Sequence, residues 1–298
     1  TRSLDGKPGA DYWQNHSDYK ISAKLDPVTG MLTGSASIIY YNSSPDTLDK
    51  LVLRLYPNIY KRDAMRDFPF KSDDDQMGMV LQSISVGKKT YDPKTDTSLE
   101  NTGTNLVIKN IAVNPGKQIT LSVNWEFKIP RENGLRMGQY DSSVFFIAYW
   151  YPQIAVYDDI DGWDMTEYTG NAEFYNDFNN YEVKISVPNN YCVWAAGELQ
   201  NPEELFIPRI LSKYAEANTS FKTINIISEQ DNSSGTPVFN TTAETNTWHF
   251  TAKGIPDFTF GTAANYLWDG RLSDAGGKKV FVSAAYKPAS IAFYEVCD

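Results

Sequence analysis

The side chains best suited to chemistry gather in one stretch of the chain, between residues 140 and 181. Aromatic residues are unusually frequent there and are interspersed with carboxylates. The carboxylates are Asp158, Asp159, Asp161, Asp164, Glu167 and Glu173. Such groups can bind a metal, act as general acids and bases, or cap turns.

The aspartates from Asp158 to Asp164 alternate before and after Gly162, a pattern that suggests a calcium loop. The complete loop requires a bidentate glutamate at its twelfth position. Counted from Asp159, that position is Gly170, so the pattern fails. The sequence favours a polar loop whose carboxylates cap turns, and calcium binding remains the weaker alternative.

Glu167 and Glu173 could form the carboxylate pair of a glycoside hydrolase, since sugar sites combine two carboxylates with aromatic platforms. The sequence does not reveal how far apart the two groups lie. Aromatic-rich strands also more often belong to a core than to a sugar site. A glycosidase is therefore an alternative, and it requires that hydrolysis disappear when either glutamate becomes glutamine.

Histidine and cysteine are scarce. The chain has only His16, His249, Cys192 and Cys297. These counts exclude a His-rich catalytic zinc site, a Cys-rich structural zinc site and a disulfide scaffold. No G-x-S-x-G nucleophile motif occurs. We expect His249 at a surface or sheet edge and Cys192 as a small buried hydrophobe. No catalytic or metal-binding residue is predicted in this chain.

Charge and composition narrow the class of protein further. The 298 residues carry 27 basic against 37 acidic side chains, a formal net charge of −10. This acidic balance argues against a nucleic-acid partner. No apolar run approaches the 18 residues of a membrane span, so no transmembrane segment is predicted. A chain of this length buries about 75% of its unfolded surface and needs no metal to hold a core.

The start of the chain and its composition bear on localisation. The first residue is Thr1, and no charged region followed by an apolar one precedes the first strand, so no signal peptide is predicted. The two cysteines and the acidic charge suit an exported bacterial protein, whether periplasmic, cell-surface or secreted. A cytoplasmic protein is the alternative.

The elements that must position these residues are mainly strands, because Val, Ile, Tyr, Thr and Phe dominate the ordered stretches. Residues 19–25 and 31–41 alternate around the turn 26–30, as in a hairpin. Helix is expected at 201–217, capped by Asn201 and broken at Pro208, and again from 288 to 297. Other strands are expected at 49–57, 80–86, 105–108, 118–127, 181–187, 192–195, 222–227, 247–252, 257–262 and 279–284. The pattern predicts a mostly β protein, built as a sandwich or a large bent sheet.

Segments spread over nearly the whole chain carry a resemblance to a known family. They are residues 18–21, 32–36, 53–58, 150–158, 162–163, 170–178, 183–188, 247–252 and 256–260. Taken in this order, they resemble the N-terminal domain of gluzincin zinc aminopeptidases, the family of aminopeptidase N and leukotriene hydrolase, in a bacterial branch.

The resemblance implies a large, saddle-shaped, bent multi-sheet β domain over residues 1–287, with one short helical insertion. This domain would pack on a thermolysin-like catalytic domain of the same polypeptide, which residues 288–298 would begin. The family's H-E-x-x-H zinc motif and G-x-M-E-N strand are absent here. Zinc and the peptide substrate are therefore expected only in the intact parent enzyme. The rival from another class is a stand-alone carbohydrate- or protein-binding β-sandwich module.

The resemblance also implies that the domain walls the substrate cleft. Family members often offer Gln or Glu to the substrate amine, nine residues before a proline. If that proline is Pro152, the position is Ser143, which supplies neither charge nor amide, so Glu173 and Gln153 become candidates. A domain without its partner should expose an aromatic patch near 145–178 and at the C-terminal helix. The expected wall comprises Ser143, Trp150, Tyr151, Gln153, Tyr168 and Glu173.

Overall fold

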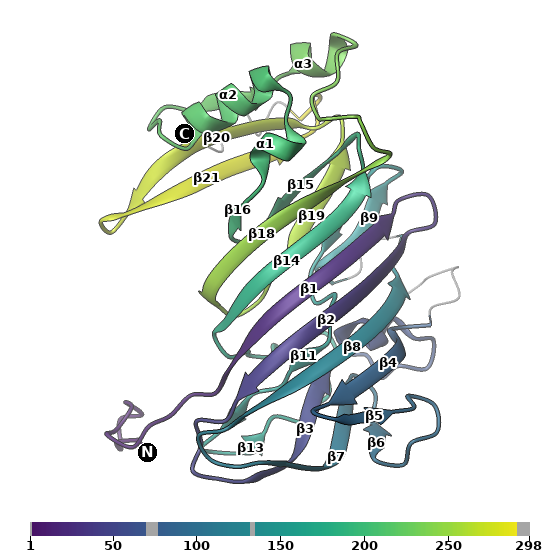
Figure 1. The fold of residues 1–298 in the computed structure, drawn as a ribbon, viewed down its shortest axis with the longest axis vertical. Coiled ribbons are helices and arrows are strands. Elements are labelled where there is room, and N and C mark those ends of the chain that lie inside the picture. Colours follow the sequence, from purple (N-terminus) through teal and green to yellow (C-terminus); the bar gives the residue numbers. More distant parts are fainter. Residues whose placement is uncertain (1, 70–76, 132–134, 291–298) are drawn as a thin grey trace.

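A computed structural model describes residues 2–69, 77–131 and 135–290 of the chain. Strands dominate these residues, and they are arranged in several sheets with a small helical part at one end (Figure 1). The mostly β, multi-sheet class predicted from the sequence is confirmed.

The largest sheet has eight strands in the order β16-β18-β14-β1-β2-β8-β4-β5. All neighbouring strands are antiparallel except β1 and β14, which run parallel. Apolar and polar residues alternate along its strands, so one face is buried and the other is solvated. The strands are β1 (His16–Asp26), β2 (Met31–Tyr41), β4 (Val80–Val86), β5 (Lys89–Tyr91), β8 (Gln118–Lys128), β14 (Asn179–Pro188), β16 (Glu198–Leu199) and β18 (Thr245–Ile255).

Two four-stranded sheets and one short hairpin lie behind the large sheet (Figure 1). One has the order β15-β19-β10-β9 and the other β11-β3-β7-β6. Leu51, Val52 and Leu53 are all fully buried because β3 is covered on both faces. The strands are β3 (Leu48–Arg54), β6 (Leu99–Asn101), β7 (Asn105–Val113), β9 (Met137–Asp141), β10 (Val144–Ile147), β11 (Gln153–Ile154), β15 (Tyr191–Ala195) and β19 (Phe260–Ala264), with the hairpin β12 (Tyr157–Asp158) and β13 (Gly162–Trp163).

Tryptophans join the layers. The Trp125 indole N–H donates to the carbonyl oxygen of Trp150 at 3.0 Å, and the Trp150 indole N–H donates to that of Phe258 at 2.9 Å. Both rings are fully buried. Trp125 lies over Gly34 on the neighbouring strand, where an added Cβ would come within 2.4 Å of the ring. Glycine at this position therefore lets the central indole pack against the strand backbone.

A three-stranded sheet, β17-β20-β21, and three short helices form the remaining layer. Its elements are β17 (Ile224–Ile227), β20 (Leu267–Ala275), β21 (Lys278–Tyr286), α1 (Pro202–Leu205), α2 (Pro208–Ala217) and α3 (Glu229–Ser233). The predicted helix is confirmed, including its interruption at Pro208, which begins α2. The Asn201 side chain does not cap the helix as expected, because its Oδ1 accepts the backbone N–H of His249 at 3.0 Å instead of a helix N–H group.

Most predicted strands are present, and the differences have local causes. The third strand ends at Arg54 rather than at residue 57, because Pro57 lies in the first turn of the 3₁₀ helix η1 (Tyr56–Tyr60). Strand β20 was not predicted, since its Asp269-Gly270 pair resembles a turn. The helix expected from residue 288 falls largely on residues 291–298, outside the described residues.

Most side chains of the aromatic stretch lie in the interior of the protein. The prediction of a large exposed aromatic patch at residues 145–178 is therefore wrong for most of these residues. Phe145, Trp150 and Tyr151 are almost completely buried. Only a minority of its rings reach solvent, among them Tyr175 and Phe178, which are 50% and 58% exposed. Within residues 2–69, 77–131 and 135–290, no helix combines the length and apolar character required to cross a membrane.

Candidate functional site

The first carboxylates of the acidic stretch hold its own turns. Asp158 Oδ1 accepts the backbone N–H groups of Ile160 and Asp161, both at 2.9 Å, and its Oδ2 accepts the Tyr175 hydroxyl at 2.7 Å. Asp159 pairs with Arg2 at 2.9 Å. Asp158 therefore caps turns of this loop, as predicted from the sequence.

Arg54 anchors the middle of the stretch from inside the molecule. Its guanidinium is only 2% exposed and pairs with Asp164. The same group donates to the Asn105 side chain and, at 2.6 Å, to the Thr166 carbonyl. A buried guanidinium requires such compensation, since an unpaired one would carry a large desolvation cost. Asp164 is therefore part of a buried polar network.

Glu167 is occupied by the turn between β6 and β7. Its Oε2 accepts the Thr104 backbone N–H at 2.6 Å and the Thr104 hydroxyl at 2.7 Å. Its Oε1 accepts Thr102 at 2.5 Å and Asn105 at 2.9 Å. With two donors on each oxygen, this carboxylate has no lone pair left for a substrate and is poorly placed to act as a general acid or base on a sugar. This arrangement disfavours the glycosidase alternative.

Glu173 is in a different environment, at the surface of the protein. Its side chain is 64% exposed, and its Oε1 pairs with Arg136 Nη2. Arg136 Nη1 donates to the Tyr149 hydroxyl at 2.8 Å. Both Arg136 and Tyr149 have left-handed backbones, with φ of 58° and 57°. Non-glycine residues adopt this conformation at a cost, and such residues cluster at functional sites.

Four aromatic rings pack against one another next to this surface ion pair. Phe174 stacks on Tyr56, with ring centroids 4.2 Å apart, and meets Tyr149 and Tyr168 edge-on at 4.9 and 5.1 Å. Burial raises the pKa of Tyr149, and it raises that of Tyr168 to about 12. Both hydroxyls are therefore neutral at physiological pH. We refer to Arg136, Tyr149, Tyr168, Glu173 and Phe174 as the rim cluster.

Three of the predicted wall residues belong to the core instead of the rim. Trp150 and Tyr151 are fully buried, and Gln153 is 2% exposed. Tyr151 donates to Asp257 at 2.9 Å, and the Gln153 amide donates to the same carboxylate at 2.6 Å. Burial nevertheless raises the pKa of Asp257. These side chains fix the position of the chain near the rim without lying on its surface.

Ser143 lies at the turn between β9 and β10. Its backbone N–H and its hydroxyl both meet Asp141 Oδ1, at 2.8 and 3.3 Å. Asp141 also pairs with Lys287 at 2.5 Å. The structure thus brings Tyr168 and Glu173 together in the rim cluster and places Ser143 in a separate polar turn.

Sequence reasoning did not single out Arg136, Tyr149, Arg54 or Asp257. Tyr149 directly precedes the Trp-Tyr-Pro segment, which was the only available signal. A left-handed backbone at Tyr149 and a buried charge at Arg54 depend on contacts between distant segments, and neither residue type predicts them.

The described residues offer no obvious metal centre. Among them, no group of three or more His, Cys, Asp or Glu side chains could hold an ion. His16 stacks on Tyr41 with ring centroids 4.5 Å apart. His249 lies 3.5 Å from Glu182, and Cys192 is buried as expected. Burial raises the pKa of the Cys192 thiol, which disfavours a thiolate.

Comparison with known proteins gives results at the level of structure only. No family model matches the chain. No curated protein matches it either.

Several solved structures are similar to this chain in fold. A mutant of the M1 zinc metallopeptidase from Deinococcus radiodurans, bound to a Tyr-Ser-Ala substrate, has 10% identity and a TM-score of 0.49, over 95% of this chain and 50% of that one. The same peptidase without the mutation has 10% identity and a TM-score of 0.46, over 92% and 47%. Aminopeptidase A from Legionella pneumophila, in complex with aspartic acid, has 12% identity and a TM-score of 0.48, over 98% and 26%. This chain thus spans half or less of each of these structures.

Proposed function

We propose that residues 1–287 form the non-catalytic N-terminal β domain of a zinc aminopeptidase, which packs on the catalytic domain and walls the substrate cleft. One observation carries this proposal: segments that resemble the family lie side by side in the large sheet. Residues 18–21, 32–36, 183–188 and 247–252 occupy β1, β2, β14 and β18, four adjacent strands. The resemblance therefore follows one continuous core and not scattered loops.

In the intact enzyme, zinc would supply a metal-activated water for hydrolysis of the N-terminal peptide bond. The zinc ligands would come from the catalytic domain, which residues 288–298 would begin. The residues of this chain would contribute the shape of the cleft and an anchor for the substrate's free amine. Tyr168, which is 7% exposed, would support this anchor from the interior, and Ser143 would line the wall from a separate turn.

Glu173 is the residue that we propose as the anchor. Its Oε1 is used by Arg136, but no hydrogen bond to its Oε2 is found within the described part of the chain. The free oxygen could accept a protonated amine, and such a charge-assisted bond gains strength where the cleft excludes water. Arg136 is itself held by Tyr149, so it would position the carboxylate and not follow the substrate.

We also propose that the parent enzyme is exported, because of its acidic charge and its few cysteines. Fractionation of source cells, with a cytoplasmic marker followed in parallel, tests this. Recovery with the cytoplasmic marker would exclude export.

The proposed function is tested by extending the coding sequence. We expect the gene to continue past Asp298 into H-E-x-x-H. The longer product should bind one zinc per chain and hydrolyse an aminoacyl chromogenic substrate, whereas the 298-residue chain should do neither. A gene that ends at Asp298, or one zinc per chain in the dialysed 298-residue protein, would overturn the proposal. A gene that ends there would favour the stand-alone binding module.

A further inference from the structure

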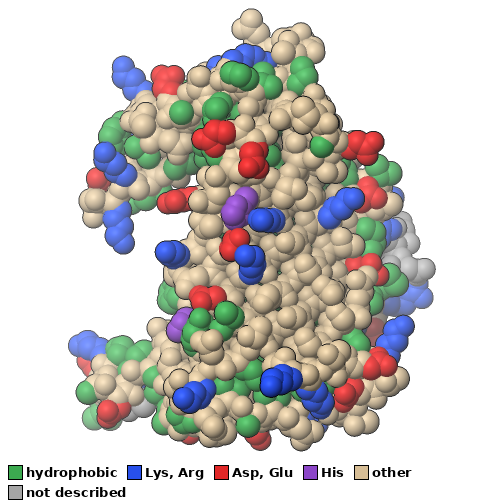
Figure 2. All heavy atoms as spheres, in the orientation of Figure 1, with side chains coloured by type: hydrophobic (Ala, Val, Ile, Leu, Met, Phe, Trp, Pro, Cys, Tyr) green, Lys and Arg blue, Asp and Glu red, His purple; other side chains and the backbone are tan. Residues whose placement is uncertain are grey.

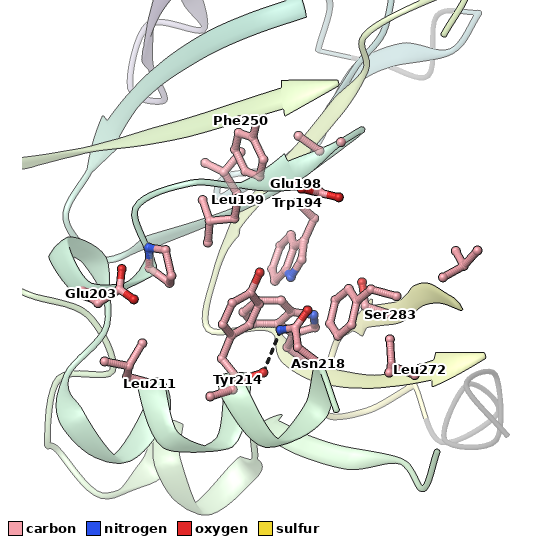
Figure 3. Close-up of a pocket in the computed structure, with 18 of the residues that line it drawn as sticks. Trp194, Glu198, Leu199, Glu203, Leu211, Tyr214, Asn218, Phe250, Leu272 and Ser283 are labelled. Atoms are coloured by element: carbon pink, nitrogen blue, oxygen red, sulfur yellow. Dashed lines mark hydrogen bonds between the residues drawn. The ribbon is translucent and has the colours of Figure 1, made fainter. Parts of the chain in front are cut away.

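A second cavity lies far from the rim cluster, at the helical end of the molecule. Its volume is about 870 Å³, and it is bounded by α2, by the β15–β16 segment and by the β20–β21 hairpin (Figure 3). The space-filling view shows the surface hollowed between this hairpin and the body of the molecule (Figure 2). The cavity is therefore accessible from solvent.

Five aromatic side chains line this cavity: Trp194, Tyr214, Phe250, Trp268 and Phe281. Trp194 meets Trp268 edge-on, with ring centroids 6.2 Å apart, and Tyr214 packs against Trp268 at 5.5 Å. Phe281 from the hairpin meets Tyr214 at 5.9 Å. In Figure 3, Trp194 and Tyr214 project from opposite sides into the same space. Such a wall can receive an apolar body and presents π faces to a cation.

Two carboxylates stand at this cavity without a cationic partner. Glu198 and Glu203 both line it and are exposed, and neither makes an ion pair within the described residues. Burial is the main cause of the raised pKa of Tyr214, and the negative charges of Glu198 and Glu203 raise it further. Both carboxylates therefore lie close enough to interact electrostatically with the Tyr214 hydroxyl. Lys279 also lines the cavity, but its ammonium lies 5.9 Å from the centre of the Phe221 ring. The charged side chains of the lining are therefore two carboxylates and one ammonium, which leaves the cavity with a net negative charge.

Two buried donors in the wall have no acceptor. The indole N–H groups of Trp194 and Trp268 find no hydrogen-bond partner within the described part of the protein, and Trp268 is only 3% exposed. A buried donor without a partner costs free energy. Both indoles line the cavity, which puts two unpartnered N–H donors in its wall.

We propose that this cavity binds an organic cation with an apolar body, either a free amine or the basic side chain of a peptide. The apolar body would contact Trp194, Tyr214 and Phe281, and the positive charge would face Glu198 and Glu203. A peptide would also offer carbonyl oxygens to the unpartnered indole N–H groups. This site is separate from the proposed substrate wall, so either proposal can fail without the other.

The charge requirement is tested by calorimetric titration of the 298-residue protein with hexylammonium and, in parallel, with hexanol. Hexylammonium should bind saturably and at least about 5-fold more tightly than hexanol, as a cation between aromatic faces and carboxylates gains over a neutral isostere. Equal affinities, no binding of either at millimolar concentration, or binding of an uncharged oligosaccharide alone would overturn the proposal.

Variants assign the effect to the cavity. Replacing both carboxylates, Glu198→Gln with Glu203→Gln, should weaken hexylammonium about 5-fold and leave hexanol unchanged. Glu244→Gln, at an exposed glutamate that does not line the cavity, is the matched control and should change neither. Near-ultraviolet circular dichroism shows whether the variants remain folded. A folded double variant with wild-type affinity for hexylammonium would contradict the site.

Capped tripeptides separate the two sources of the cation. If the natural ligand is a peptide, capped Ala-Arg-Ala should bind more tightly than hexylammonium, and capped Ala-Gln-Ala more weakly than both. If it is a free amine, hexylammonium should bind more tightly than Ala-Arg-Ala. Binding of the arginine and glutamine peptides with equal affinity would contradict the charge requirement.

Discussion

Glu167 and Glu173 are six residues apart in the same acidic stretch, yet the structure gives them opposite environments. Glu167 accepts hydrogen bonds from Thr102, Thr104 and Asn105 and joins two distant segments. Glu173 is mostly exposed and touches one guanidinium. Both oxygens of Glu167 accept hydrogen bonds from the protein. Glu173 Oε2, in contrast, accepts none from the described residues and is available to a ligand.

This difference shows that acidity alone does not identify a functional residue. A carboxylate whose lone pairs are all used stabilises the fold and is not available to a substrate. Arg54 and Asp164 belong to the saturated group, because they compensate each other inside the protein. If this comparison is right, mutations should affect stability in one region and substrate use in the other.

The largest effect is expected for Arg54→Met, which leaves Asp164 and Asn105 without their buried partner. Removing one member of a buried ion pair typically costs about 3–5 kcal/mol. Urea unfolding, followed by tryptophan fluorescence, should show a loss of this size. A loss below about 1 kcal/mol would mean that the network contributes little, and it would remove the distinction between the two regions.

Asp177 provides a pH-dependent test in the same part of the chain. Burial and the charge of Asp158 raise its pKa from 3.8 to about 7. The folded state therefore retains a proton that the unfolded state releases, so stability falls as pH rises from about 4 to about 7. At 1.36 kcal/mol per pKa unit, the loss is roughly 3–4 kcal/mol.

The measurement for Asp177 is the unfolding free energy of the wild type and of Asp177→Asn at several pH values. Relative to the variant, the wild type should lose stability between pH 4 and pH 7. A difference that stays constant over this range would show that Asp177 titrates normally.

Glu167→Gln should have a moderate effect on stability. The amide keeps one acceptor oxygen but turns an N–H₂ group toward donors of the β6–β7 turn. Hydrogen bonds to charged groups contribute about 1.5–3 kcal/mol, and the loss should lie in that range. Thermal unfolding of this variant beside Glu173→Gln measures the contrast. Equal losses of stability in Glu167→Gln and Glu173→Gln would refute the proposed difference between the two carboxylates.

Much of the fold could be predicted from the sequence because its signals are local. The alternation in β1, β2 and β8 and the helix break at Pro208 are each set by neighbouring residues. The candidate site was only partly predictable. Glu173 and Tyr168 were identified, but Arg136 reaches Glu173 across 37 residues and Tyr149 across 13. Contacts of this kind leave no periodic pattern in the sequence.

The smallest stability effect and the most direct test of the account belong to Glu173. Its exposed ion pair should contribute no more than about 0.5 kcal/mol to folding. In the longer zinc enzyme that we propose, Glu173→Gln should lower kcat/KM about 10- to 150-fold, the equivalent of one lost charge-assisted bond at 1.4 kcal/mol per decade. Glu244→Gln serves as the control and should leave both unchanged.

The deciding measurement is therefore kcat/KM of Glu173→Gln in that longer protein, with unfolding followed on the same samples. The account predicts a large kinetic loss with nearly unchanged stability. Wild-type kinetics in a folded Glu173→Gln variant would contradict it and would reduce Glu173 to a surface partner of Arg136.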